Sequence, residues 1–122
     1  MPVLLLVDDD ELVLELLNDI LQDEFTVVTA TDGPSALEKL RLLSDLDGVI
    51  TDFDMPRMSG LELMWRIRQR YPTLPMVGLS GTLRSHHQIA GRCPEGVVFL
   101  QKPFEVSELL AVAQRLFQPT GK

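Results

Sequence analysis

Five polar residues of this sequence stand close behind short apolar runs, and together their side chains suit phosphoryl transfer. They are Asp8, Asp9, Asp52, Ser80 and Lys102. Carboxylates brought close together repel one another, and a bound cation relieves that repulsion. Oxygen ligands that leave room for water and phosphate oxygens suit Mg²⁺. A lysine adds a compact positive charge, and a hydroxyl can donate to a phosphoryl oxygen. A carboxylate nucleophile, a metal, a cation and a donor are the parts that phosphoryl transfer requires.

The apolar runs predict five strands, because short and continuously apolar runs are typical of strands buried on both faces. We expect these strands at residues 3–7, 25–30, 49–52, 75–79 and 96–100. A helical pattern follows each strand. We expect helices at 11–22, from the turn at 32–34 onward, from the Ser59 cap to about Arg70, at 83–90 (a weak pattern) and at 105–117.

Strands that alternate with helices in this way predict an α/β fold, a parallel sheet with helices on both faces. The carboxyl ends of parallel strands meet at one edge, so the polar residues that follow four of the strands should converge there. Each residue alone has an ordinary explanation: an Asp after a strand often caps a helix or forms a turn, and Ser80-Gly81 is typical of a turn. Those explanations do not account for reactive side chains at four separate strand ends.

The segment Asp52-x-x-Met-Pro-x-x-x-Gly60 resembles the phosphoacceptor segment of response-regulator receiver domains. The resemblance extends over residues 3–117 and includes the Leu-Leu-Val-Asp-Asp-Asp segment that begins at Leu5. It implies a flavodoxin-like, doubly wound five-stranded parallel sheet in the order 2-1-3-4-5 with five helices. It also implies a receiver domain at 1–118 and a short tail at 119–122.

The resemblance also implies roles for individual residues. Asp52 matches the phosphoacceptor, Asp9 the direct metal ligand and Asp8 its partner. Asp54 matches the position whose backbone carbonyl binds the metal, which in this family is Mg²⁺.

Three further residues match the switch of the family. Ser80 matches the switch hydroxyl, Lys102 the family's lysine and Phe99 the switch aromatic. The peptide bond before Pro103 is expected to be cis, a form found mainly before proline. The departures are mild: Ser stands for the commoner Thr, Gly81 for Ala, and Phe99 lacks the phenol oxygen of the commoner Tyr.

The resemblance implies a protein that is not an enzyme and changes its affinity for a partner once phosphorylated. The expected partner is a histidine kinase or a histidine phosphotransfer protein. A homodimer through the face of the fourth helix, fifth strand and fifth helix is a candidate assembly. Two segments, 79–81 and 100–104, look like those of hybrid-kinase receivers.

Two other function classes compete with this interpretation. Asp52-Phe53-Asp54 is similar to the Asp-x-Asp of haloacid-dehalogenase-type phosphatases, but Met55-Pro56 follows it and the chain has no room for a substrate cap. A pure interaction module would keep the fold without the chemistry. Such modules usually lack an acid or the lysine, and this sequence retains both.

The composition of the chain limits the partners and the cellular location that we expect for it. The chain has 122 residues and a net charge of −7, which disfavours binding to nucleic acid and to anionic membranes. We expect a cytoplasmic protein without a targeting segment. We interpret Cys93 as an incidental thiol that fits a reducing compartment, and His86 and His87 as surface residues.

Overall fold

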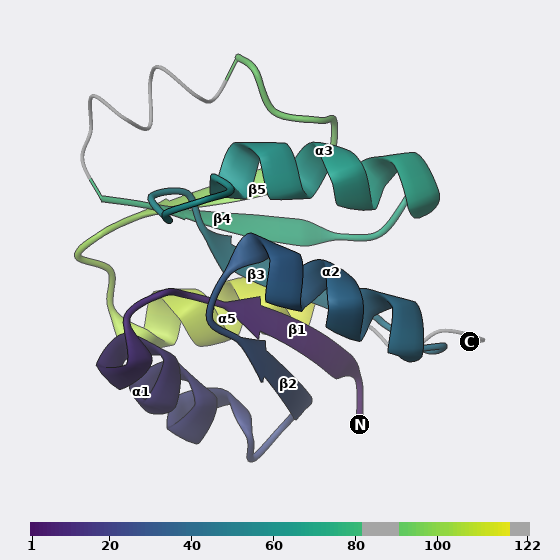
Figure 1. Cartoon of the computed structure of the whole chain (residues 1–122). Coiled ribbons are helices and arrows are strands. Elements are labelled where there is room, and N and C mark those ends of the chain that lie inside the picture. Colours follow the sequence, from purple (N-terminus) through teal and green to yellow (C-terminus); the bar gives the residue numbers. More distant parts are fainter. Residues whose placement is uncertain (82–90, 118–122) are drawn as a thin grey trace.

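The computed structural model describes residues 1–81 and 91–117, which form a parallel sheet between two layers of helices (Figure 1). The sheet has five strands in the order β2-β1-β3-β4-β5, and every neighbouring pair is parallel. The strands are β1 (Val3–Val7), β2 (Thr26–Ala30), β3 (Gly48–Asp52), β4 (Met76–Ser80) and β5 (Val97–Gln101). The predicted flavodoxin-like sheet and its order are confirmed.

Four helices lie within the described ranges. They are α1 (Glu11–Leu21), α2 (Gly33–Leu42), α3 (Gly60–Arg70) and α5 (Val106–Leu116). None of these four is both long and apolar enough to cross a bilayer. The helix predicted at 83–90 and the tail predicted at 119–122 lie outside the described residues, so the proposed domain boundary near residue 118 stays a prediction.

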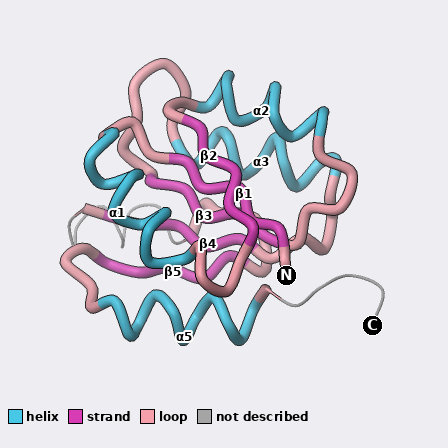
Figure 2. Tube along the Cα trace, turned by 90° about the horizontal axis from the view of Figure 1, so that it is seen from below, coloured by secondary structure: helices cyan, strands magenta, loops and turns pink. Residues whose placement is uncertain are grey.

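The helices cover both faces of the sheet, with α1 and α5 on one side and α2 and α3 on the other (Figure 2). Strand β1 supplies both cores in alternation. Leu5 and Val7 pack with residues of α2 and α3, while Leu4 and Leu6 pack with residues of α1 and α5. All four side chains are fully buried, which explains why the strand is a continuous apolar run instead of an alternating one.

Side-chain caps fix the points where three helices begin. The Asp10 carboxylate accepts hydrogen bonds from the N–H groups of the first turn of α1, and Asp32 and Ser59 do the same for α2 and α3. The predicted Ser59 cap is confirmed. Because each cap lies in the loop that follows a strand, the caps hold the loops at the carboxyl edge of the sheet.

The inward face that helical spacing predicts for α1 is confirmed only in part. The spacing predicts apolar contacts from residues 13, 16, 17, 20 and 21, with Leu12 and Leu14 on the surface. Leu17 and Leu21 are buried and Leu12 is exposed, as predicted, but Leu14 is buried and Leu16 is 59% exposed. This leucine-rich helix carries two overlapping stripes at helical spacing, and packing against the sheet selects the stripe that contains Leu14.

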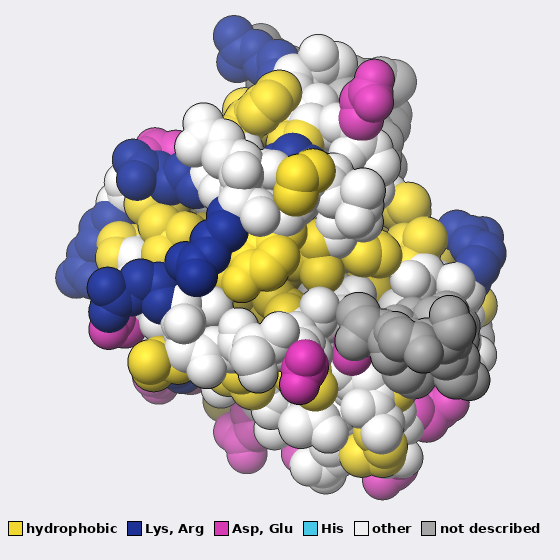
Figure 3. Space-filling model, turned by 90° about the vertical axis from the view of Figure 1, so that its right-hand side faces the viewer, with side chains coloured by type: hydrophobic (Ala, Val, Ile, Leu, Met, Phe, Trp, Pro, Cys, Tyr) yellow, Lys and Arg dark blue, Asp and Glu magenta, His cyan; other side chains and the backbone are white. Residues whose placement is uncertain are grey.

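The amino edge of the sheet is apolar at its surface. Leu46, Tyr71, Leu74 and Pro75 line a hollow there, and the guanidinium of Arg70 lies 5.7 Å from the centre of the Tyr71 ring. Hydrophobic side chains gather in the middle of this face with Lys and Arg side chains along one side (Figure 3). Basic residues occur in the last turns of α2, α3 and α5, where they complement the helix dipoles.

Candidate functional site

The carboxyl edge of the sheet brings together the polar residues that the sequence places after the strands. Asp8 follows β1, Asp52 ends β3, and Lys102 follows β5. The Lys102 Nζ atom lies 3.4 Å from Asp52 Oδ1 and 3.8 Å from Asp8 Oδ2. Residues from three separate strand ends therefore meet, as the parallel topology predicts.

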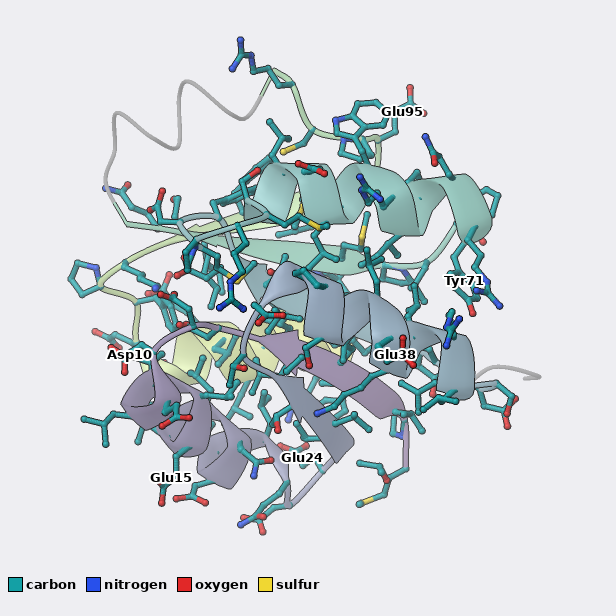
Figure 4. The ribbon with its side chains drawn as sticks, viewed as in Figure 1. Asp10, Glu15, Glu24, Glu38, Tyr71 and Glu95 are labelled. Atoms are coloured by element: carbon teal, nitrogen blue, oxygen red, sulfur yellow. The ribbon has the colours of Figure 1, made fainter. Side chains whose placement is uncertain are left out.

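Three carboxylates form a cluster at this edge. Asp8, Asp9 and Asp52 each offer one oxygen, and these oxygens lie within 4.8 Å of one another. Asp8 and Asp52 are buried, whereas Asp9 is exposed, so the cluster has one side open to solvent. Asp10 stands next to the cluster at the start of α1, and its carboxylate caps the helix (Figure 4).

The buried Asp8 carboxylate is only partly satisfied. Its Oδ1 accepts a hydrogen bond of 2.9 Å from the Asp10 N–H. Its Oδ2 is buried and has no hydrogen-bond donor among the described residues. Burial raises the pKa of Asp8, and the Asp10 N–H and the Lys102 charge offset only part of that rise. An unsatisfied buried oxygen beside two other carboxylates is a position that a cation can satisfy.

Asp52 has a similar environment. Its Oδ1 lies 3.4 Å from the Asp54 nitrogen, from which it accepts a hydrogen bond. Burial raises the pKa of Asp52 above its usual range, while the Lys102 charge acts in the opposite direction. A second positive charge at this edge would favour the ionised carboxylate.

The backbone of Asp52 is held by a close approach of α3. A Cβ atom at Gly60 would lie 2.2 Å from the Asp52 carbonyl oxygen, so only glycine fits at this position. The Gly60 N–H donates to the Phe53 carbonyl at 3.0 Å, and the Thr51 hydroxyl donates to the Asp52 carbonyl at 3.0 Å. The first turn of α3 therefore packs directly on the backbone at the end of β3.

The donor set fits magnesium. Asp8, Asp9 and Asp52 supply only oxygen ligands, and the open side leaves space for water or phosphate oxygens, which Mg²⁺ usually retains. The Asp54 side chain is exposed. This exposure is compatible with the predicted role of Asp54, which uses the backbone carbonyl and not the side chain. That role of Asp54 stays a prediction.

Ser80 lies on β4, the strand next to β3, and Phe99 lies on β5, the edge strand beyond β4. Ser80 is fully buried at the end of β4, and its carbonyl accepts a hydrogen bond of 2.7 Å from the Lys102 N–H. The peptide bond between Lys102 and Pro103 is cis, as predicted. Phe99 is partly buried, and its ring stacks on the ring of Phe53.

Phe53 and Arg57 are two residues near the site that the sequence reasoning missed. The Phe53–Phe99 contact joins β3 to β5 and cannot be seen in any local pattern. Arg57 has a φ of 68° and forms an ion pair of 3.1 Å with Asp32, which ties the loop after β3 to the loop after β2. No sequence pattern predicts a positive φ at Arg57, although the neighbouring Pro56 indicates a turn.

Other residues singled out in the sequence lie away from this edge or outside the described residues. Cys93 is a free thiol, partly buried, and burial raises its pKa to about 11, which agrees with an incidental role. His86 and His87 lie in the part of the chain that the structure does not describe.

Comparison with known proteins decides the family. The family model for the response regulator receiver domain matches residues 4–114. The chain belongs to this family. The predicted resemblance is therefore confirmed over nearly the whole chain.

This receiver domain is similar to parts of longer regulators. It is 35% identical over 122 residues to the probable transcriptional regulatory protein TcrX of Mycobacterium tuberculosis, covering 98% of this chain and 52% of that protein. The receiver chain thus spans about half the length of the curated relatives that it matches first.

Solved receiver structures share the fold. Chemotaxis protein CheY4 of Vibrio cholerae is 31% identical, with a TM-score of 0.86, covering 96% of this chain and 99% of that chain. Response regulator protein TrrA of Thermotoga maritima, solved in complex with Mg(2+)-BeF, is 29% identical with a TM-score of 0.85. That match covers 96% of this chain and all of the TrrA chain, 100%.

Proposed function

We propose that this receiver domain accepts a phosphoryl group from a partner's phosphohistidine onto Asp52, with Mg²⁺ bound beside it, and then changes its affinity for an output partner. The observation that carries this proposal is the position of Lys102 Nζ, 3.4 Å from Asp52 Oδ1, inside a cluster of three carboxylates. This arrangement supports the proposal because phosphoryl transfer to a carboxylate needs a nucleophile, a positive charge and oxygen ligands for a metal.

The transfer is a single displacement at phosphorus. An Asp52 carboxylate oxygen forms the new P–O bond while the P–N bond of the phosphohistidine breaks, and the imidazole nitrogen keeps the electron pair. The Lys102 ammonium stabilises the charge on the phosphoryl oxygens. Asp8, Asp9, Asp52 and the Asp54 carbonyl would hold the metal, which supplies further charge stabilisation when bound.

The switch follows from the added charge. A phosphoryl group places about −1.5 to −2 charges beside Asp52, judged by analogy with other phosphorylated side chains. Ser80 and Lys102 then move toward the phosphoryl oxygens, and Phe99 turns inward into the space that Ser80 leaves. The output is a changed surface that includes β5 and α5.

The partners are proposed by analogy with the family. The phosphoryl donor is a histidine kinase or a histidine phosphotransfer protein, and this encounter takes place in the cytoplasm. A homodimer through β5, α5 and the fourth helix stays a prediction, because residues 82–90 lie outside the described ranges. Binding of nucleic acid or membrane is not part of the proposed function of this domain, whose net charge is −7.

The alternatives predict different products. As a signalling receiver the domain should be labelled once by a small phosphodonor and should not turn over a separate substrate. The test is to incubate it with acetyl phosphate and Mg²⁺, follow intact mass, and measure hydrolysis of p-nitrophenyl phosphate in parallel. One added phosphoryl group without ester hydrolysis supports the proposal. Sustained ester hydrolysis would favour a phosphatase, and absence of both signals would favour a pure interaction module.

A further inference from the structure

Two aromatic rings meet across a strand beside the proposed phosphorylation site. Phe53 directly follows Asp52 at the end of β3, and Phe99 lies on β5, with β4 between them. Their ring centroids are 5.7 Å apart and their planes differ by 19°, so the rings are stacked. Stacked rings make a directional contact between the end of β3 and the edge strand β5.

The contact exists because β4 carries glycine where the rings meet. Gly78 is the register partner of Phe99 on β5 and of Thr51 on β3. A Cβ atom at Gly78 would lie 2.3 Å from both Cε2 and Cζ of Phe53. Any side chain at this position would therefore push the Phe53 ring out of the space over β4 and away from Phe99.

The backbone of Phe53 is also held by β4 and α3. Its N–H donates to the Leu79 carbonyl at 3.1 Å, and its carbonyl accepts from the Gly60 N–H at 3.0 Å. The side chain is only 4% exposed. The Met64 methyl group would also lie within 3.1 Å of a Cβ at Gly78, so α3 closes the same space. In a close-packed interior the ring cannot shift without moving its neighbours.

We propose that Phe53 is a positioning residue for Phe99, and that a change at Asp52 reaches β5 through the stacked rings over Gly78. This inference rests on the proposed function, because it describes how the proposed switch is transmitted. Asp52 and Phe53 share a peptide bond, so a displacement of the end of β3 moves the ring of Phe53. The Phe99 ring must follow, since the two rings fill one space.

The test separates transmission from simple core packing. Phe53→Leu removes the ring, and Phe53→Leu combined with Gly78→Ala adds a methyl group in the space that the ring leaves. Phe25→Leu is the matched control, because Phe25 belongs to an aromatic pair with Phe117 in the core on the other face of the sheet. Should Phe53→Leu not fold, Phe53→Met replaces it with an unbranched side chain that also lacks a ring.

Three quantities are measured for each variant: stability in urea, labelling of Asp52 by acetyl phosphate with Mg²⁺, and the change in amide chemical shifts at residues 97–101 on adding the beryllofluoride mimic. We expect Phe53→Leu to be labelled like the parent but to lose most of the shift change. The double variant should regain stability without regaining the shift change. Phe25→Leu should lose stability but keep the change in amide chemical shifts.

Several results would overturn the inference. They are an unaltered shift change in Phe53→Leu, recovery of the shift change together with stability in the double variant, and an equal loss in Phe25→Leu. If the parent protein responds to the mimic, these results overturn only the proposed role of Phe53 and leave the proposed phosphorylation of Asp52 standing. A parent that is neither labelled nor shifted contradicts the proposed function, and this inference falls with it.

Discussion

The ammonium nitrogen of Lys102 lies 3.4 Å from Asp52 Oδ1 and 3.8 Å from Asp8 Oδ2, so one cation faces two buried carboxylates. Asp9 adds a third carboxylate to the same cluster. When all three are ionised, three negative charges against one positive charge leave two uncompensated, which one divalent cation balances. The charge count at this edge thus suits Mg²⁺, which would remove the repulsion between the carboxylates and an incoming phosphoryl group.

Lys102→Ala should slow phosphorylation of Asp52 by acetyl phosphate by about 10²-fold or more, because the ammonium stabilises charge on the transferring group. Arg66→Ala is the control: it removes an equal charge from an exposed ion pair with Glu62 on α3. The measurement is the initial rate of mass labelling at fixed Mg²⁺. Equal rates in the two variants would show that Lys102 has no role in the transfer.

Asp9→Ala and Asp10→Ala should have opposite consequences, although the residues are adjacent. Asp9 belongs to the carboxylate cluster, so its loss should weaken Mg²⁺ binding and leave α1 intact. Asp10 caps α1, so its loss should cost about 1 kcal/mol of stability and leave Mg²⁺ binding nearly unchanged. Mg²⁺ titrations and urea unfolding measure the two effects, and equal weakening of Mg²⁺ binding in both variants would refute the ligand assignment.

Gly60→Ala should destabilise the domain by about 1–3 kcal/mol, the usual cost of overpacking. The added Cβ would lie 2.2 Å from the Asp52 carbonyl, so relief of the clash must also displace the acceptor and slow its labelling. Gly91→Ala is the matched control, because nothing lies within 4 Å of its Cβ position. Urea unfolding and labelling rates check both effects. A Gly60 variant as stable and as reactive as the Gly91 variant would contradict the described contact.

Asp8→Asn should stabilise the metal-free protein at neutral pH. Burial raises the pKa of Asp8 in the folded state above its usual 3.8, so the folded protein holds this proton more tightly than the unfolded chain. The contribution of Asp8 to stability is therefore full below about pH 3.8 and is lost as the pH rises through the raised pKa. The Asn variant carries no charge at any pH and avoids this loss.

Urea unfolding in EDTA at pH 3 and at pH 7 measures the difference between Asp8→Asn and the parent. We expect a clear stabilisation at pH 7 that shrinks at pH 3, where the parent carboxyl is also neutral. With saturating Mg²⁺ the order should reverse at pH 7, because only the parent retains the ligand. A variant that is less stable than the metal-free parent at pH 7 would show that burial does not dominate the environment of Asp8.

Local patterns were sufficient to predict the sheet and the edge that carries the site. Continuous apolar runs identify buried parallel strands, and the topology then brings their carboxyl ends together whatever the details of packing. This is why the proximity of Asp8, Asp52 and Lys102 could be predicted. The strand order and the individual roles needed the family resemblance as well.

Features that depend on packing between distant residues could not be predicted. The sequence of α1 allows two apolar stripes, and only contact with the sheet decides that Leu14 is buried and Leu16 exposed. The stack of Phe53 on Phe99 depends on the missing side chain of Gly78, which lies on a third strand. No window of neighbouring residues contains all three.

Asp52→Asn should abolish phosphorylation, since an amide is not a nucleophile. The parent, Asp52→Asn and Asp54→Asn are incubated with acetyl phosphate and Mg²⁺, and intact mass is recorded before and after treatment with hydroxylamine, which cleaves acyl phosphates. We expect the parent and Asp54→Asn to gain one phosphoryl group that hydroxylamine removes, and Asp52→Asn to gain none. Undiminished labelling of Asp52→Asn would place the acceptor elsewhere and contradict phosphoryl transfer to Asp52.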